Sequence, residues 1–283
     1  METLVTHTDL DGAGSIVLAN IYHIIFKNII TIDYNRIDVN KLINLCPIIM
    51  TDLSIPEEDF LKFQNHKITI YDHHESSSYL KKYNGQILDT SRCGTKIFYQ
   101  EYIQKHHNYR YIPEVEMFVH MVDTYDRWQE TNPAWEDAVN LNRLFKALKL
   151  DSFVQSAVKF IKNKLVYTKY DKMLIARMEA QENKDYNDSK RTLNTFIDSR
   201  GIKYGVCKLF NNASVTCNRM LKSDPSMIYV IGYYDNGIIS ARSIPQFNLL
   251  EFNELHGHKN AAGGLLDKNS LYNLLSGTSL HYN

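Results

Sequence analysis

The first half of the chain alternates short apolar runs with stretches in which apolar residues recur at helical spacing. The apolar runs predict strands over 4–6, 29–32, 48–51 and 67–71. The helical spacing predicts helices over 12–27, 56–65, 95–106 and 113–125. This alternation predicts an α/β fold, in which a mostly parallel sheet is covered by flanking helices.

The second half is organised differently. Residues 151–195 have helical spacing and are rich in Lys, Tyr, Gln and Asn, which predicts a helical arm. A second α/β pattern begins at Gly201, with strands predicted over 204–210, 228–234 and 238–243 and the turn sequence Asp235-Asn236-Gly237 between the last two. We therefore expect a first domain over 1–150, a helical connector over 151–200 and a smaller α/β domain over 201–283.

The formal net charge of zero conceals an asymmetry along the chain. Residues 1–142 hold 12 basic and 20 acidic side chains, whereas residues 143–200 hold 13 and 7. An acidic first part suits cation binding and a basic remainder suits an anionic substrate, although solvated helix faces would give the same pattern. The lack of an overall positive charge argues against a long nucleic-acid footprint, whereas a short oligonucleotide or a nucleotide needs far less.

The cysteine pattern and the hydropathy indicate a cytoplasmic protein. Cys46, Cys93, Cys207 and Cys217 are scattered and form no C-x-x-C pair, so we interpret them as free thiols in a reducing compartment. No stretch approaches the roughly 18 consecutive apolar residues that span a bilayer, and the N-terminus lacks a signal-peptide pattern. We expect no membrane partner, and the sequence leaves a homodimer as one option.

Acidic and imidazole side chains follow three of the predicted strands at the point where each strand ends. They are His7, Asp9, Asp11, Asp52, Asp72, His73 and His74. In an open parallel sheet, ligands bind beyond the carboxyl ends of the strands. We therefore expect these side chains to converge at one edge of the sheet.

Some of these residues also have a plainer interpretation. Asp9 or Asp11 could cap the helix that follows, although a cap accounts for one acid and not for two acids and a His. An Asp between a strand and a helix, such as Asp52, is usually a turn or cap residue. Asp123 lies among apolar residues on the helix 113–125, where a covered carboxylate needs a partner. Asp126, three residues on, could share its face and is predicted to be the more exposed of the two.

The whole set supplies enough ligands for two metal ions with a shared carboxylate. Crowded carboxylates would repel one another strongly without cations. Asp oxygens together with neutral His nitrogens suit Mn, Fe or Zn. Two ions about 3.5–4 Å apart can activate a water and neutralise charge on a phosphoryl group, so the pattern indicates a dinuclear phosphoesterase site.

Six short motifs lie in order along the chain. They are His7-Thr8-Asp9-Leu10-Asp11-Gly12, Thr51-Asp52-Leu53-Ser54, Tyr71-Asp72-His73-His74, Val122-Asp123-Thr124-Tyr125-Asp126, Ser240-Ala241-Arg242-Ser243 and the glycine-rich segment 256–264. Together they resemble the DHH phosphoesterases, in particular the two-lobed members with a DHHA1 C-terminal domain. The short first motif is most similar to the nano-RNase (oligoribonuclease) branch. The resemblance spans nearly the whole chain apart from the helical connector.

The resemblance implies a DHH catalytic domain over 1–150 that binds two Mn²⁺ ions, with Co²⁺ or Mg²⁺ as alternatives. It implies that Asp72 orients an imidazole and that His74 contacts the scissile phosphate or donates a proton. The first ion would be held by His7, Asp9 and Asp52. The second would be held by Asp11, Asp52, His73 and Asp123, with Asp52 bridging.

The resemblance also implies a DHHA1-like substrate-binding domain over 201–283, in which Arg242 and His258 hold a substrate phosphate. Gly257, Gly263 and Gly264 would let backbone N–H groups approach the anion. His256 stands where the family usually has Gly, so its side chain would narrow the pocket or add a phosphate contact.

These inferences predict a Mn²⁺-dependent phosphodiesterase or exonuclease that hydrolyses short RNA or single-stranded DNA to mononucleotides. A cleft between the two lobes would limit the length of the substrate. One alternative is a phosphohydrolase of cyclic or bis-phosphorylated nucleotides. The other is a non-catalytic nucleotide-binding module, against which the complete ligand set argues.

Overall fold

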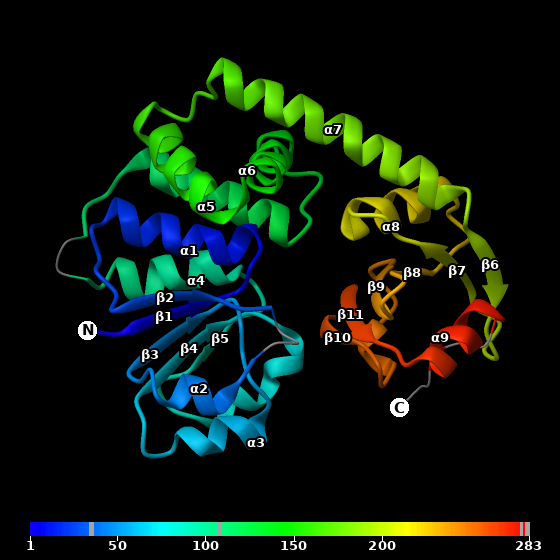
Figure 1. Cartoon of the computed structure of the whole chain (residues 1–283), viewed down its shortest axis with the longest axis horizontal. Helices are drawn as coiled ribbons and strands as arrows, with labels where there is room; N and C mark the ends of the chain where they lie inside the picture. The colour runs from blue at the N-terminus through cyan, green and yellow to red at the C-terminus, as the bar shows by residue number, and fades with distance from the viewer. Residues whose placement is uncertain (34–36, 107–108, 278–279, 281–283) are drawn as a thin grey trace. The chain divides into compact units, whose positions relative to one another are not determined.

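The computed structural model describes residues 1–33, 37–106, 109–277 and Leu280. The chain divides into two compact units, Met1–Met178 and Glu179–Asn283 (Figure 1). Each unit has its own sheet and its own hydrophobic core.

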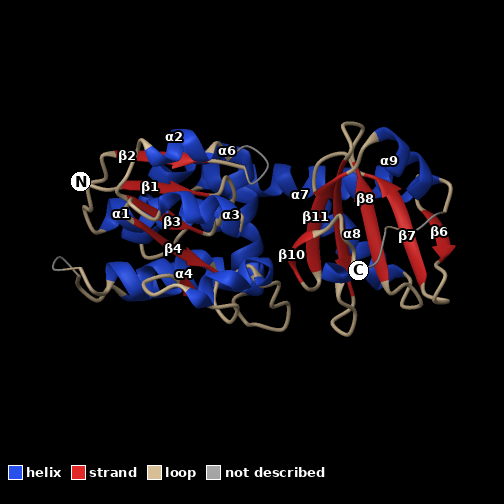
Figure 2. Cartoon of the chain, turned by 90° about the horizontal axis from the view of Figure 1, so that it is seen from below, coloured by secondary structure: helices blue, strands red, loops and turns tan. Residues whose placement is uncertain are grey.

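The first unit is built on a five-stranded parallel sheet (Figure 2). The sequence predicts a mostly parallel sheet and four of these strands, and it misses the short strand Ile87–Leu88. The strand order is β2-β1-β3-β4-β5, and every neighbouring pair is parallel. The strands are β1 (Thr3–Thr6), β2 (Asn28–Thr31), β3 (Ile48–Thr51), β4 (Ile68–Asp72) and β5 (Ile87–Leu88). Because β1, β3 and β4 are adjacent and parallel, the residues that follow them begin at one edge of the sheet.

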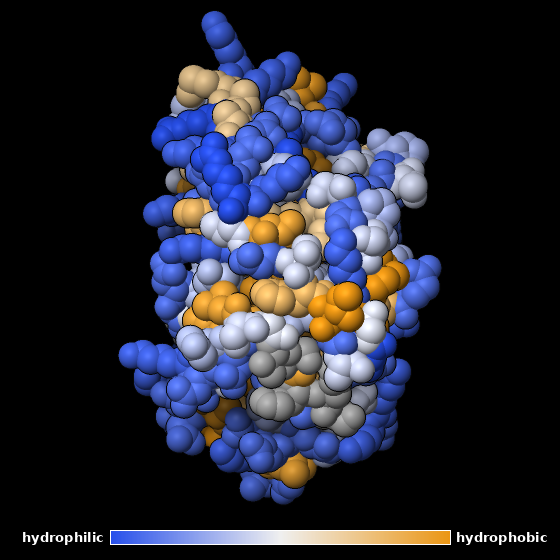
Figure 3. Space-filling model, turned by 90° about the vertical axis from the view of Figure 1, so that its right-hand side faces the viewer, coloured by the Kyte–Doolittle hydropathy of each residue, from blue (hydrophilic) through white to orange (hydrophobic). Residues whose placement is uncertain are grey.

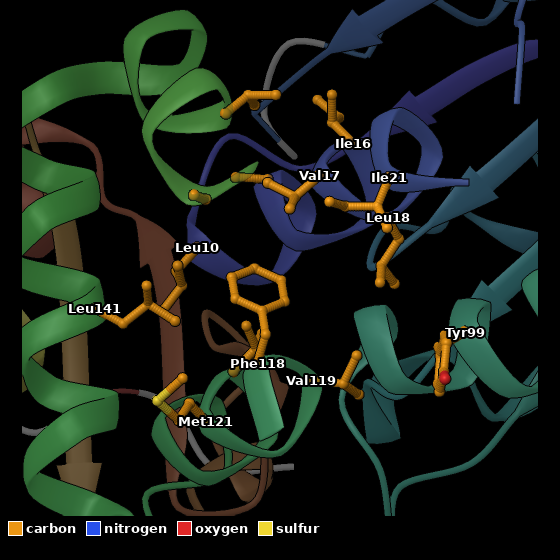
Figure 4. Packing of buried hydrophobic residues seen from close by; sticks show 14 of the residues in the cluster. Leu10, Ile16, Val17, Leu18, Ile21, Tyr99, Phe118, Val119, Met121 and Leu141 are labelled. Atoms are coloured by element: carbon orange, nitrogen blue, oxygen red, sulfur yellow. The ribbon is translucent and has the colours of Figure 1, made fainter. Parts of the chain in front are cut away.

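Helices cover both faces of this sheet (Figure 1). They are α1 (Leu10–Ile21), α2 (Val39–Ile43), α3 (Glu57–Phe60), α4 (Gly94–Phe98), α5 (Pro113–Asp126) and α6 (Trp135–Lys162). On one face, Leu10 of α1, Phe118 and Met121 of α5 and Leu141 of α6 are buried in one apolar cluster (Figure 4). This packing fixes α1 and α5, which carry candidate ligands at their ends.

Two helical predictions differ from the structure. The helix predicted over 95–106 begins as α4 and continues as a π-helical segment, Tyr99–Ile103. The helical stretch predicted from residue 151 already begins at Trp135 as α6, whose helical dihedrals are interrupted at Lys149. After α6 come α7 (Lys169–Lys190) and β6 (Asn194–Ile197), so the region 151–200 ends in a strand.

The second unit contains a six-stranded mixed sheet in the order β10-β11-β9-β8-β7-β6. Its other strands are β7 (Lys203–Lys208), β8 (Tyr229–Tyr233), β9 (Ile238–Ser243), β10 (His256–His258) and β11 (Ala261–Leu265). The helices α8 (Ala213–Ser223) and α9 (Lys268–Leu275) complete it. The predicted turn between β8 and β9 is present, with Gly237 at a φ of 85° that favours glycine.

The face that Figure 3 shows is largely polar, with apolar patches between polar side chains. Among the helices of the described residues, none has both the length and the apolar character that crossing a membrane requires. The mixed α/β architecture with two separate sheets agrees with the predicted fold class.

Candidate metal centre

The carboxyl ends of β1 and β3 bring together His7, Asp9 and Asp52. One potential ligand atom from each of the three lies within 4.8 Å of the others. His7 Nδ1 lies 2.9 Å from Asp9 Oδ2 and 4.0 Å from Asp52 Oδ2. One imidazole and two carboxylates at this spacing can hold a divalent cation.

A second group forms from Asp11 on α1, His73 after β4 and Asp126 at the end of α5. His73 Nε2 lies 3.6 Å from Asp11 Oδ2, and His73 Nδ1 lies 3.5 Å from Asp126 Oδ2. Asp52 joins the two groups, because its Oδ1 lies 3.0 Å from His73 Nε2. Asp52 also has a φ of 54°, a conformation that non-glycine residues rarely adopt and that is typical of functional sites.

Asp123, a predicted metal ligand, accepts hydrogen bonds from residues at the start of α4. Its Oδ1 accepts a hydrogen bond from the Cys93 backbone at 2.8 Å, and its Oδ2 accepts one from Lys96 Nζ at 2.8 Å. Asp126 is the more exposed of the two acids, as predicted, and its carboxylate lies beside His73. The carboxylate of Asp123 is thus directed to the start of α4, and its role as a metal ligand stays a prediction.

The start of α4 is a part of the site that the sequence analysis missed. Both oxygens of Asp11 accept backbone hydrogen bonds, from Gly94 N at 2.6 Å and from Thr95 N at 2.7 Å. A Cβ on Gly94 would come within 2.5 Å of the Asp52 Cβ, so only glycine allows this approach. The available signal was Gly94 directly before a helical pattern, but its partners lie far away in the sequence.

Asp72 and His74 form a pair beside these groups. Asp72 is fully buried, and its Oδ1 lies 2.7 Å from His74 Nδ1. Burial alone would raise the pKa of Asp72, but the charge and hydrogen bond of His74 lower it below the usual range. The imidazole that Asp72 orients is therefore that of His74, whose side chain is 29% exposed.

The electrostatics of the site fit divalent cations. Burial, together with the charges of Asp9 and Asp11, raises the pKa of Asp52 well above its ordinary value. Burial and the charge of Asp11 do the same for the pKa of Asp126. One oxygen each of Asp52 and Asp126 (both Oδ2) is buried and accepts no hydrogen bond from the described residues. Cations would satisfy these oxygens and remove the repulsion between the carboxylates.

The His7 imidazole is also suited to bind a divalent cation. The adjacent Asp9 carboxylate raises the pKa of His7 to about 9. A metal ion bound here would take the place of that proton, because a metal ligand must be neutral imidazole.

The predicted phosphate-binding residues lie on three neighbouring strands of the second sheet, β10, β11 and β9. Arg242 on β9 is opposite Ala261 on β11, and His256 on β10 is opposite Gly263. Gly257 has a φ of 125°, and a Cβ on Gly264 would meet the Glu254 carbonyl oxygen, so both positions depend on glycine. His256 is exposed and His258 is partly buried.

Comparison with known proteins gives one curated relative over nearly the whole chain. No family model matches the sequence. The chain is 21% identical to oligoribonuclease NrnB of Bacillus subtilis over 290 residues, which cover 93% of this chain and 71% of that protein.

Two solved structures with similar folds agree with this likeness. The pGpG-specific phosphodiesterase PggH from Vibrio cholerae is 13% identical with a TM-score of 0.58, covering 98% of this chain and 97% of its own. RecJ from Thermus thermophilus, solved in complex with Mn²⁺, is 13% identical with a TM-score of 0.54, covering 97% of this chain and 51% of its own. The resemblance to the DHH phosphoesterases that the motifs indicated is confirmed.

Proposed function

We propose that this DHH-family phosphoesterase hydrolyses the phosphodiester bonds of short oligonucleotides to mononucleotides, using two bound divalent cations. The observation that carries the proposal is the pair of ligand groups joined by Asp52 at the carboxyl edge of the parallel sheet. The name of the curated relative, an oligoribonuclease, agrees with a short oligonucleotide as substrate. The name of PggH, specific for the dinucleotide pGpG, agrees as well.

In the proposed arrangement, His7, Asp9 and Asp52 hold one cation. Asp11, Asp52, His73 and Asp126 hold the second, with Asp126 in the place that the sequence analysis gave to Asp123. We propose Mn²⁺ for both positions because of the mixed carboxylate and imidazole ligands. Such ions activate a water and stabilise the charge that develops on a phosphoryl group.

The other residues of the site orient the His74 ring, protonate the leaving oxygen and bind a substrate phosphate. Asp72 Oδ1 lies 2.7 Å from His74 Nδ1. The other ring nitrogen of His74, Nε2, therefore points away from Asp72. His74 can then donate a proton to the leaving oxygen from Nε2. In the second unit, Arg242 has the planar donor fork that pairs with phosphate oxygens, and we propose that it binds a substrate phosphate together with His258.

A panel of substrates tests this proposal. Di- to decanucleotides of RNA and DNA, cyclic dinucleotides and a 3′,5′-bisphosphate nucleotide are incubated with Mn²⁺, Co²⁺ or Mg²⁺, and the products are separated. We expect Mn²⁺-dependent release of mononucleotides, with a rate that falls steeply as the oligonucleotide lengthens. The variant Asp52→Ala serves as the control for contaminating nucleases, because it removes the carboxylate shared by the two ligand groups.

Other outcomes would replace the proposal. A preference for long single strands, or for the cyclic or bis-phosphorylated nucleotides, would assign a different substrate to the same site. Nucleotide binding without turnover under all three metals would favour a binding module.

A further inference from the structure

The guanidinium of Arg242 is held by three hydrogen bonds within the second unit. Its Nη1 donates to Ser240 Oγ at 3.2 Å and to the Ala241 carbonyl oxygen at 2.7 Å. Its Nη2 donates to Ser214 Oγ. Ser240 and Ala241 lie on the same strand as Arg242, whereas Ser214 is the second residue of α8. The contact with Ser214 therefore ties the end of the side chain to a separate element.

We infer that Ser214 is a positioning residue, which fixes the orientation of the Arg242 guanidinium for a substrate phosphate. The inference rests on the proposed function, in which Arg242 binds that phosphate. An arginine fork pairs with phosphate oxygens only when its plane faces them correctly. A long side chain that is already fixed loses less rotamer entropy when the substrate binds.

The location of Ser214 is itself well defined. Asn212, the residue before α8, donates from Nδ2 to Asp185 Oδ2 at 2.7 Å. Asp185 lies on α7, is 2% exposed and also accepts a hydrogen bond from Gln181. These buried contacts anchor the first turn of α8, which is the turn that carries Ser214. The amino end of a helix also carries partial positive charge, so a phosphate at Arg242 would be bound near a favourable dipole.

Four variants test the inference on a 5′-phosphorylated dinucleotide with Mn²⁺. Ser214→Ala should raise KM about five-fold, the factor that corresponds to one hydrogen bond of ordinary strength, with a smaller change in kcat. Ser214→Thr keeps the hydroxyl and should restore KM. Ser223→Ala, at the opposite end of α8, is the matched control and should match the wild type. In a protein that already carries Arg242→Ala, Ser214→Ala should cause no further change in KM, because Ser214 acts through Arg242.

The same variants separate the inference from the proposed function. The Kd of a phosphorothioate dinucleotide is measured beside turnover, and bound Mn²⁺ and the melting temperature are recorded for each protein. If the wild type binds this ligand but does not hydrolyse the unmodified dinucleotide, the proposed function fails and the Kd of Ser214→Ala still decides the inference. The inference would be overturned if Ser214→Ala left KM and Kd unchanged. It would also be overturned if Ser214→Ala changed KM equally in the presence and in the absence of Arg242. A wild type that neither binds nor hydrolyses would overturn both.

Discussion

At the scale of single residues, Asp123 and Asp126 show that spacing along the chain does not decide which acid lies beside His73. Both lie near the end of α5, three residues apart. Lys96 and the Cys93 backbone use both oxygens of Asp123, whereas Asp126 lies beside His73. The ammonium group of Lys96 already balances the charge of Asp123, whereas we expect a metal ion to balance that of Asp126.

Substitution of each acid by asparagine separates these roles. Asp126→Asn should lose one of the two bound Mn²⁺ ions and nearly all activity, because it removes a charged ligand. Asp123→Asn should keep two ions per chain but lower stability by about 1–3 kcal/mol, the usual cost when a buried polar group loses a partner. Metal content by elemental analysis and urea unfolding measure the two effects. The reverse pattern would make Asp123 the ligand.

At the scale of elements, the sequence predicted the part of the site that depends on local pattern. Apolar runs followed by acids mark the ends of strands, and this pattern is enough to place His7, Asp52 and His73 at one sheet edge. The start of α4 could not be predicted in this way, because Gly94 and Thr95 act through contacts with Asp11 that span more than 80 residues. No short-range pattern carries such information.

The position of α6 was missed for a related reason. Its first half contains Ala138, Leu141 and Leu144, which are buried in the cluster that also includes residues of α1 and α5. That half therefore belongs to the core of the first unit. A helical period predicts a helix, but it does not reveal the surface against which the helix packs.

The close approach of α4 to the metal centre gives a second prediction. Gly94→Ala should displace Asp52, because the new Cβ would come within 2.5 Å of the Asp52 side chain and 2.7 Å of its Cα. We expect a loss of about 1–3 kcal/mol in the free energy of unfolding, as for other overpacked positions, together with weaker Mn²⁺ binding. Calorimetric titration and urea unfolding measure both.

Gly85→Ala is the matched control for this substitution. It also places alanine at a glycine, with a φ of 84°, but its Cβ would meet nothing within 4 Å. It should therefore lower stability without any change in Mn²⁺ affinity. Equal Mn²⁺ affinities in both variants would mean that the contact between Gly94 and Asp52 has no role in the metal centre.

At the scale of the whole molecule, we expect the crowded carboxylates of the candidate metal centre to oppose the stability of the first unit until cations bind. Asp52 is 2% exposed, and its burial together with the charges of Asp9, Asp11 and Asp126 raises its pKa. Repulsion between buried like charges destabilises the folded state, and unfolding relieves it. We therefore expect the stability of the fold to depend on the cations for which this arrangement would create affinity.

This dependence gives the last prediction, which compares melting temperatures with Mn²⁺ and with a chelator. Mn²⁺ at one hundred times its Kd should stabilise the wild type by about 2.7 kcal/mol for each independent site. Asp52→Asn removes one of the repelling charges and the ligand that joins the two groups. It should therefore melt at or above the wild-type temperature in the chelator and gain little from Mn²⁺. Asp59→Asn on α3, whose acid pairs with Lys62, should respond to Mn²⁺ as the wild type does. A chelated Asp52→Asn protein that melts well below the chelated wild type would mean that Asp52 stabilises the metal-free fold, and that its carboxylate is not held in place for a cation.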